Sequence, residues 1–106
     1  MTTPTFTICA STTDTDIEAA IPFCEMRREA IERRDDAAAV IDEQGDQAVL
    51  DLYEINGVTV LWSEAYCYGV VNETGPGVGD CMYVSEDQDG VVSPVQAAAY
   101  WTSGRC

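Results

Sequence analysis

Two β-prone segments, 48–55 and 58–63, flank Asn56 and Gly57 in the middle of the chain. Asn-Gly between apolar segments is the strongest short-range signal for a two-residue β-hairpin turn. Apolar residues fall on both faces of the two strands, so we expect the hairpin to lie centrally, with one face beneath a helix. The turn imposes the following pairs: Ile55 with Val58, Tyr53 with Val60, Asp51 with Trp62, and Leu52 with Leu61.

Three further segments carry strand signals. Residues 5–9 (TFTIC) alternate between polar and apolar positions, and residues 65–71 (AYCYGVV) and 81–85 are β-prone. A glycine-rich stretch at 72–80 separates the last two and predicts a loop. Because loops of this kind often carry binding residues, 73–80 is a secondary candidate for an interaction.

A helical region precedes the hairpin. Thr15 and Glu18 have the spacing of a capping box, and Pro22 predicts a break after a short first turn. We therefore expect a main helix over 22–34 and a second, short helix over 94–101 that begins with a proline. The apolar stripe of the helical region comprises Ile17, Ala20, Ile21, Cys24, Ile31, Ala38 and Ile41.

Together these elements predict one small α+β domain over residues 1–106, with one main helix packed on an antiparallel sheet of three to five strands. A chain of this length buries enough surface for one core. The N-terminus lacks a basic segment, and no apolar run approaches the length of a membrane span. If the chain is unprocessed, we expect a cytoplasmic protein.

The charge of the chain narrows the possible functions more than any motif does. The chain has 19 acidic residues against five arginines, and it lacks lysine and histidine. The absence of histidine excludes Ser-His and Cys-His nucleophile pairs, and the scarcity of bases excludes direct binding to nucleic-acid phosphates. Four of the arginines lie in one eight-residue window, whereas 35–104 contains 13 carboxylates and no base. We expect the arginine window to form a solvated, salt-bridged helix face.

Three explanations fit the acidity. It can reflect a halophilic or GC-rich source, a carboxylate surface that imitates nucleic-acid phosphates, or a divalent-cation site. The third is the weakest, because 85–96 has the wrong residues at both ends for a calcium loop and Asp87 to Gly90 is better explained as a turn. Composition by itself does not separate the first two.

Other motifs indicate structure rather than chemistry. The five cysteines lack C-x-x-C spacing, so we expect free thiols, with Cys9 and Cys24 as small core residues. Hairpin arithmetic places Val71 opposite Cys81, which leaves Cys67 too far from Cys81 for a disulfide bond. The glycines of 75–79 match no phosphate-binding pattern.

We predict a non-catalytic acidic protein that binds another protein, of the kind that phages use as inhibitors. Its carboxylates would imitate nucleic-acid phosphates and block a basic site on a nucleic-acid-binding partner. We assign no catalytic residue, metal ligand or cofactor, and expect no membrane contact and a monomer or weak homodimer. The alternative is a structural or assembly protein whose acidity serves only solubility. The residues predicted to contact the partner are Asp35, Asp36, Asp42 and Glu43 after the helix, and Asp51, Glu54 and Glu64 on the hairpin.

Overall fold

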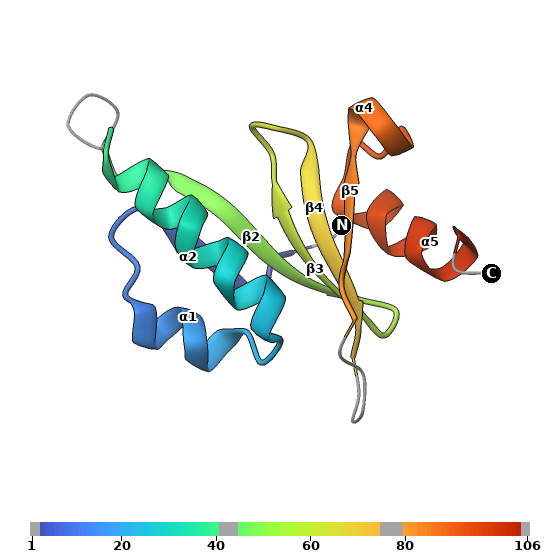
Figure 1. Ribbon diagram of the computed structural model, residues 1–106, viewed down its shortest axis with the longest axis horizontal. Helices are drawn as coiled ribbons and strands as arrows, with labels where there is room; N and C mark the ends of the chain where they lie inside the picture. The colour runs from blue at the N-terminus through green and yellow to red at the C-terminus, as the bar shows by residue number, and fades with distance from the viewer. Residues whose placement is uncertain (1–2, 41–44, 75–79, 105–106) are drawn as a thin grey trace.

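Five antiparallel strands form one sheet in which each strand pairs with its neighbour in the sequence (Figure 1). The computed structural model describes residues 3–40, 45–74 and 80–104. It confirms an α+β fold with one main helix packed on an antiparallel sheet. The elements are β1 (Phe6–Cys9), α1 (Asp14–Ala20), α2 (Cys24–Ala38), β2 (Ala48–Ile55), β3 (Val58–Ser63), β4 (Tyr68–Glu73), β5 (Met82–Ser85), α4 (Glu86–Asp89) and α5 (Pro94–Gly104).

The central hairpin has the predicted bounds and the predicted register. Asn56 and Gly57 have φ angles of 51° and 81°, the left-handed values that a type I′ turn requires at both central positions. Asp51 pairs with Trp62 and Leu52 with Leu61, as the two-residue turn demands. The hairpin lies within the sheet, and each of its faces contributes residues to a buried core.

The helical region divides at Pro22 into two helices. The predicted capping box is wrong, because Thr13 caps α1 by accepting a hydrogen bond from the backbone N–H of Asp16 at 3.2 Å. The helix α2 then begins at Cys24, so its buried positions are Met26 and Ala30. Cys24 is exposed and is not the core residue that the stripe predicted, because the break at Pro22 changes the phase of the apolar face.

One face of the sheet is covered by α1 and α2. Its core joins one residue of α1 and the C-cap of that helix, two residues of α2, and inward side chains of β1 to β4 (Figure 1). Leu52 pairs with Leu61 and Leu61 with Val70, which builds one apolar row across three strands. The members of this core are Ile8, Ile17, Ile21, Met26, Ala30, Leu50, Leu52, Leu61 and Val70.

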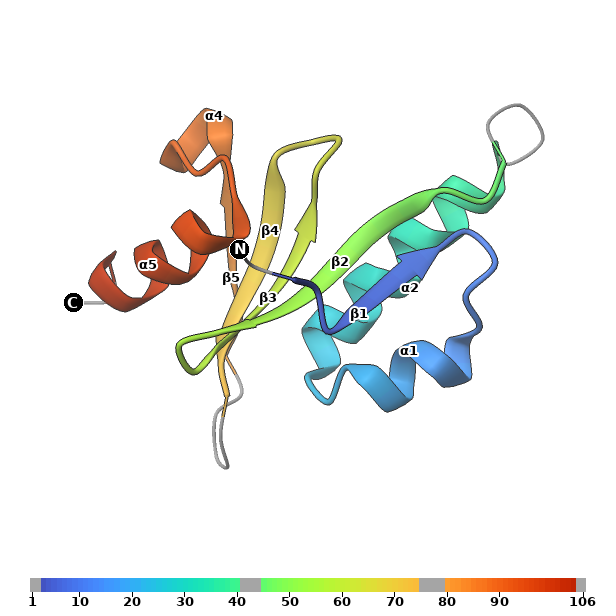
Figure 2. The same cartoon turned by 180° about the vertical axis from the view of Figure 1, so that it is seen from behind.

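The opposite face is covered by α5, which begins at Pro94. The hydroxyl of the preceding residue, Ser93, accepts a hydrogen bond from the backbone N–H of Gln96 at 3.2 Å and so caps the first turn. Trp62 and Trp101 are 1% and 4% exposed in this second core. Both tryptophan side chains are therefore buried in the core. Seen from behind, β1 and the adjacent part of β2 are not covered by α5 (Figure 2).

A four-residue turn, 64–67, connects β3 to β4 and places its side chains at the end of the sheet. The strand β4 starts at Tyr68, later than predicted, and Cys67 at the turn has a φ angle of 45°. Val71 pairs with Met82 rather than Cys81, so the predicted register is wrong by one residue. Cys67 and Cys81 are nevertheless free thiols, as predicted.

Candidate protein-binding site

A hollow with a volume of about 350 Å³ lies where the C-terminal half of α2 meets the first residues of β2 and the turn after β3. The helix contributes Arg33 and Asp36, and Val40 follows just after its end. The strand β2 contributes Asp51, and the turn after β3 contributes Glu64 and Tyr66. The β3–β4 turn positions Glu64 and Tyr66, since it reverses the chain just beyond the last residue of β3. The hollow is thus built from the end of the main helix, the neighbouring start of β2, and two more distant parts of the chain, Ala10 and the turn after β3.

Three acidic residues line this hollow: Asp36, Asp51 and Glu64. None of them forms an ion pair with a residue that the structure describes. Asp51 accepts a hydrogen bond from the hydroxyl of Thr7 at 2.9 Å, which fixes the carboxylate on the uncovered part of the sheet. Burial raises the pKa of Tyr53, and the charges of Asp51 and Glu64 raise it further. The two charges therefore act on the same region of the sheet.

These carboxylates are spread around the hollow rather than converging on one point. Within residues 3–40, 45–74 and 80–104, no three Cys, Asp or Glu side chains lie close enough together to hold a metal ion. The chemistry of the hollow is therefore that of a negatively charged recess with an apolar wall.

A chain of ring contacts continues from the hollow across the sheet. The guanidinium carbon of Arg33 lies 5.6 Å from the ring centroid of Tyr66 and 5.2 Å from that of Tyr68. Tyr68 in turn stacks on Tyr83, with 5.9 Å between ring centroids and 27° between ring planes. We name Tyr66, Arg33, Tyr68 and Tyr83 the tyrosine ladder; both of its ends are exposed, Tyr66 at 70% and Tyr83 at 47%.

Glu29 holds the ladder in place. Its Oε1 accepts hydrogen bonds from Arg33 Nε at 3.0 Å and from the Tyr68 hydroxyl at 3.2 Å. Burial raises the pKa of Tyr68 well above its usual value, and the charge and hydrogen bond of Glu29 add to this effect. The centre of the ladder is thus fixed by hydrogen bonds, and its residues are tyrosine and arginine, which are enriched among the residues that dominate binding energy at protein interfaces.

The other predicted contact residues lie elsewhere. Glu54 is at the hairpin end of β2, where its carboxylate accepts hydrogen bonds from the hydroxyls of Thr59 and Thr74, both at 2.9 Å. Asp35 is engaged by Arg34. Asp42 and Glu43 lie outside the described residues, as do residues 75–79 of the glycine-rich loop. The structure therefore brings together Asp36, Asp51 and Glu64, and it separates Asp35 and Glu54 from them.

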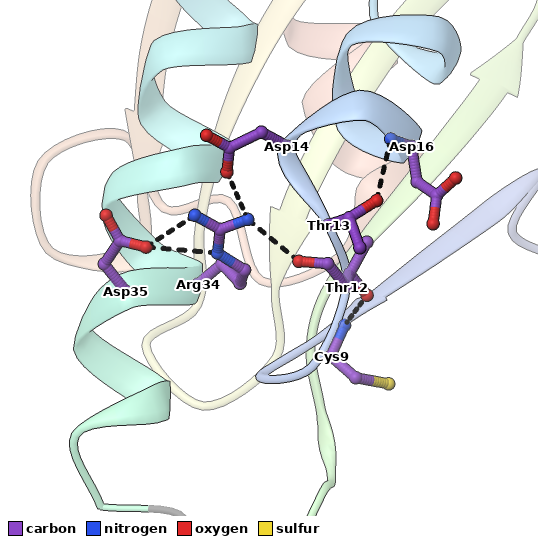
Figure 3. A network of polar contacts seen from close by, with 7 residues as sticks. All are labelled: Cys9, Thr12, Thr13, Asp14, Asp16, Arg34 and Asp35. Carbon is purple, nitrogen blue, oxygen red and sulfur yellow. Dashed lines mark hydrogen bonds and ion pairs between the residues drawn. The ribbon is translucent and has the colours of Figure 1, made fainter.

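Arg34 is a structural residue and not part of a solvated helix face. Its side chain is 13% exposed and pairs with Asp14 at 2.5 Å and Asp35 at 2.6 Å. The guanidinium also donates to the backbone carbonyl of Thr12 at 2.8 Å (Figure 3). Thr12 accepts a further bond from the backbone N–H of Cys9, so the network joins α2 to the end of β1.

The sequence analysis missed the tyrosine ladder. The pair Glu29–Arg33 was expected from its four-residue spacing, but not the rings that the guanidinium covers. Tyr66 and Tyr68 alternate with small residues, which could have indicated an aromatic face. Tyr83 is 15 residues further along the chain, and only the pairing of β4 with β5 brings it next to Tyr68.

Cys81 has two hydrogen-bond donors but no sign of nucleophilic character. Asn72 donates from Nδ2 to its sulfur at 3.2 Å, and the backbone N–H of Met26 also donates to it. Burial outweighs both donors and raises the pKa of this thiol. The thiol is therefore protonated at neutral pH, whereas a nucleophilic cysteine requires the thiolate.

No known protein family, curated protein or solved structure matches this chain. Among the residues that the structure describes, no helix has the length and apolar character needed to cross a membrane. Function must therefore be inferred from the surface of this chain.

Proposed function

We propose that this protein is a non-catalytic, acidic binding protein that occupies the basic site of a nucleic-acid-binding partner, in the manner of phage-encoded inhibitors. The observation that supports it is a difference between the positive and the negative side chains in how many of them are paired within the chain. Each of the four arginines in the described residues is engaged within the chain, whereas the carboxylates of the hollow have no basic partner there. The protein therefore presents an outer surface of negative charge.

The arginines are engaged in different ways. Arg27 donates to the backbone carbonyls of Ile21 and Pro22, at 3.1 and 3.3 Å, and so ties α1 to α2. Arg28 pairs with Glu25, and Arg33 and Arg34 are held as described above. Since these four guanidinium groups are engaged within the chain, they do little to offset the net charge of -14 that a partner would meet.

Such a surface favours a partner that normally binds a polyanion. Opposite potentials accelerate the encounter of two proteins and exclude partners of the same charge. A nucleic-acid-binding protein carries a groove of Lys and Arg side chains that is complementary to this surface. Under this proposal the protein acts in the cytoplasm as a monomer or weak homodimer, without a cofactor, and contacts neither nucleic acid nor membrane directly.

A pulldown from host lysate tests the proposal. The full chain is immobilised, and the lysate is applied at 50 mM and at 500 mM salt. We expect basic, nucleic-acid-binding proteins to be recovered at low salt and released at high salt, because screening weakens charge pairing. Competition by DNA or RNA for the same partner should reduce recovery. If no basic protein is recovered at low salt, the proposal is wrong.

A structural or assembly protein from a halophilic or GC-rich source is the second candidate. The observation that favours it is the exposure of two valines beside α5, Val92 at 47% and Val95 at 50%. It predicts self-association through this apolar surface and stability that increases with molar salt. Melting across a salt series, with light scattering to measure mass, separates the two candidates, since the first predicts a salt-sensitive hetero-complex instead.

A further inference from the structure

The outer side of α5 carries no charged residue, although the chain as a whole has a net charge of -14. The uncharged segment runs from Gly90 to Gly104 and includes the whole helix. Its two exposed valines, Val92 and Val95, are 47% and 50% accessible to solvent. The protein therefore exposes apolar side chains in a segment that carries no charge.

A groove with a volume of about 320 Å³ lies between α5 and the β2–β3 turn. The helix contributes Val95, Ala98, Ala99 and Thr102 to it, and the turn contributes Asn56. Three of the helical residues are exposed and follow one another at steps of four and three residues, so they lie on one side of the helix. The groove is thus lined by apolar and neutral polar side chains, which we name the α5 groove.

The carboxylates nearest to α5 in the chain or the sheet do not line this groove. Asp89 accepts a hydrogen bond from the Tyr100 hydroxyl at 3.0 Å and another from the edge of β5. Glu54 is held by two threonine hydroxyls. Glu73 is two residues from Val71 of the α5 core and so lies on the same side of β4, but outside the groove.

The other large apolar side chains that the structure shows as exposed have charged neighbours. Val40 and Tyr66 line the acidic hollow, and the charges of Glu25 and Arg28 act on Tyr83. A basic partner gains nothing from an uncharged groove, whereas a second copy of this chain is repelled by every acidic surface. In the described part of the chain, the α5 groove is therefore the apolar surface that a second copy can approach with the least repulsion.

We propose that two copies of this protein pair through their α5 grooves about a two-fold axis, with Val95 of each copy packed in the groove of the other. The eleven residues of α5 span about 16 Å, so the contact is small and the dimer weak. A two-fold contact uses the same surface of both copies and closes at two. The helix α2 covers the opposite face of the sheet, so the contact leaves it free in both copies.

Sedimentation velocity over a concentration series of the full chain tests the pairing. A reducing agent is present throughout, because Cys24 is an exposed thiol. We expect a reversible rise towards twice the monomer mass, and several-fold tighter association at about 500 mM than at about 50 mM salt, since screening weakens the repulsion between two acidic molecules. Amide chemical shifts should change on dilution at 56–57 and 92–102.

Two valine substitutions add the same charge at different exposed positions. Val95→Glu places a carboxylate in the groove and should weaken the dimer about tenfold or more. Val40→Glu, at a position that is 58% exposed beside the acidic hollow, should weaken it less than twofold. Thr102→Glu is a second groove variant and should act like Val95→Glu, and thermal melting establishes that each variant folds.

The outcomes separate this pairing from the proposed function, on which it does not depend. A monomer at all concentrations and salts, equal weakening by Val95→Glu and Val40→Glu, or shift changes outside α5 and the turn would overturn it. A mass that grows beyond two copies would also overturn the closed dimer, and it would favour the assembly candidate. Recovery of a basic partner in the pulldown supports the proposed function whichever of these results is obtained.

Discussion

The two faces of the sheet are covered by helices of opposite character. On one face, α1 and α2 are tied to the sheet and to each other by arginine contacts, including the Arg34 network that reaches the end of β1 (Figure 3). On the other face, α5 contains no charged residue between Pro94 and Gly104, and it packs through Trp101 and alanines. One face therefore depends on polar contacts as well as apolar ones, and the other mainly on apolar burial.

This difference shows how a chain with few bases can use them. All four described arginines lie on α2, where they fix two helices and the tyrosine ladder, and none supports α5. The α5 face needs no ion pair, because two buried tryptophans supply a large apolar area. The hollow lies at the end of α2, where charge and aromatic contacts are already part of the structure.

Trp62→Ala should break the α5 face with the largest effect. Removing a buried tryptophan lowers the free energy of unfolding by about 3–5 kcal/mol, a large share of the stability of a small domain. Met26→Ala in the other core is the matched substitution, with an expected loss of about 2–5 kcal/mol. Urea denaturation measures both. A loss below about 2 kcal/mol for Trp62→Ala would contradict the dependence of this face on tryptophan burial.

Gly69→Ala tests the packing of the same tryptophan from the neighbouring strand. A Cβ at Gly69 would lie 2.6 Å from Cε3 of Trp62, closer than such atoms approach. Because Trp62 is buried and has no free space to move into, we expect a loss of about 1–3 kcal/mol. The double variant Gly69→Ala with Trp62→Ala should show much less than the sum of the two losses. Additive losses would mean that the clash is not with this ring.

Arg34→Ala tests the polar contacts of the α2 face. It leaves the Thr12 carbonyl and two carboxylates without their donor, and should lower stability by about 1–2 kcal/mol. Arg28→Ala is the control, because that guanidinium pairs only with Glu25 on an exposed surface and should change stability little or not at all. Equal losses in chemical denaturation would show that Arg34 contributes no more than a surface ion pair.

Tyr68→Phe should change the alkaline stability of the α2 face, with the smallest effect. The pKa of Tyr68 is raised in the folded protein, so above the ordinary tyrosine value of about 10 the unfolded chain loses this proton and the folded chain keeps it. Stability then falls as pH rises. The variant lacks this component, so its stability should decline less steeply between pH 10 and 11.5. Parallel curves in urea titrations would contradict the role of Tyr68.

Some parts of the fold could be predicted from local residues. Asn56-Gly57 determines its own turn, and the turn then fixes every pair of the β2–β3 ladder. Pro22 marks the break between α1 and α2 for a similarly local reason. The phase of α2 could not be predicted in the same way, because Met26 and Ala30 become the buried positions only once the helix starts at Cys24.

The candidate site shows the same limit. Asp51 and Glu64 were predicted as contact residues on the hairpin, and both line the hollow. Glu54 was grouped with them, but its carboxylate accepts hydrogen bonds from Thr59 and Thr74 at the other end of β2. Tyr83 was not considered, since its contact with Tyr68 depends on strand pairing across a loop.

The sequence by itself determined the central hairpin, the α+β class and the gathering of four of the five arginines in one helix, because each is visible in short segments of the chain. Only the tertiary structure decided that the arginines of α2 would be engaged within the chain, that both tryptophans would be buried in the core beneath α5, and that Asp36, Asp51 and Glu64 would line one hollow. These outcomes depend on contacts between segments far apart in the chain, which the packing of helices on both faces of the sheet selects.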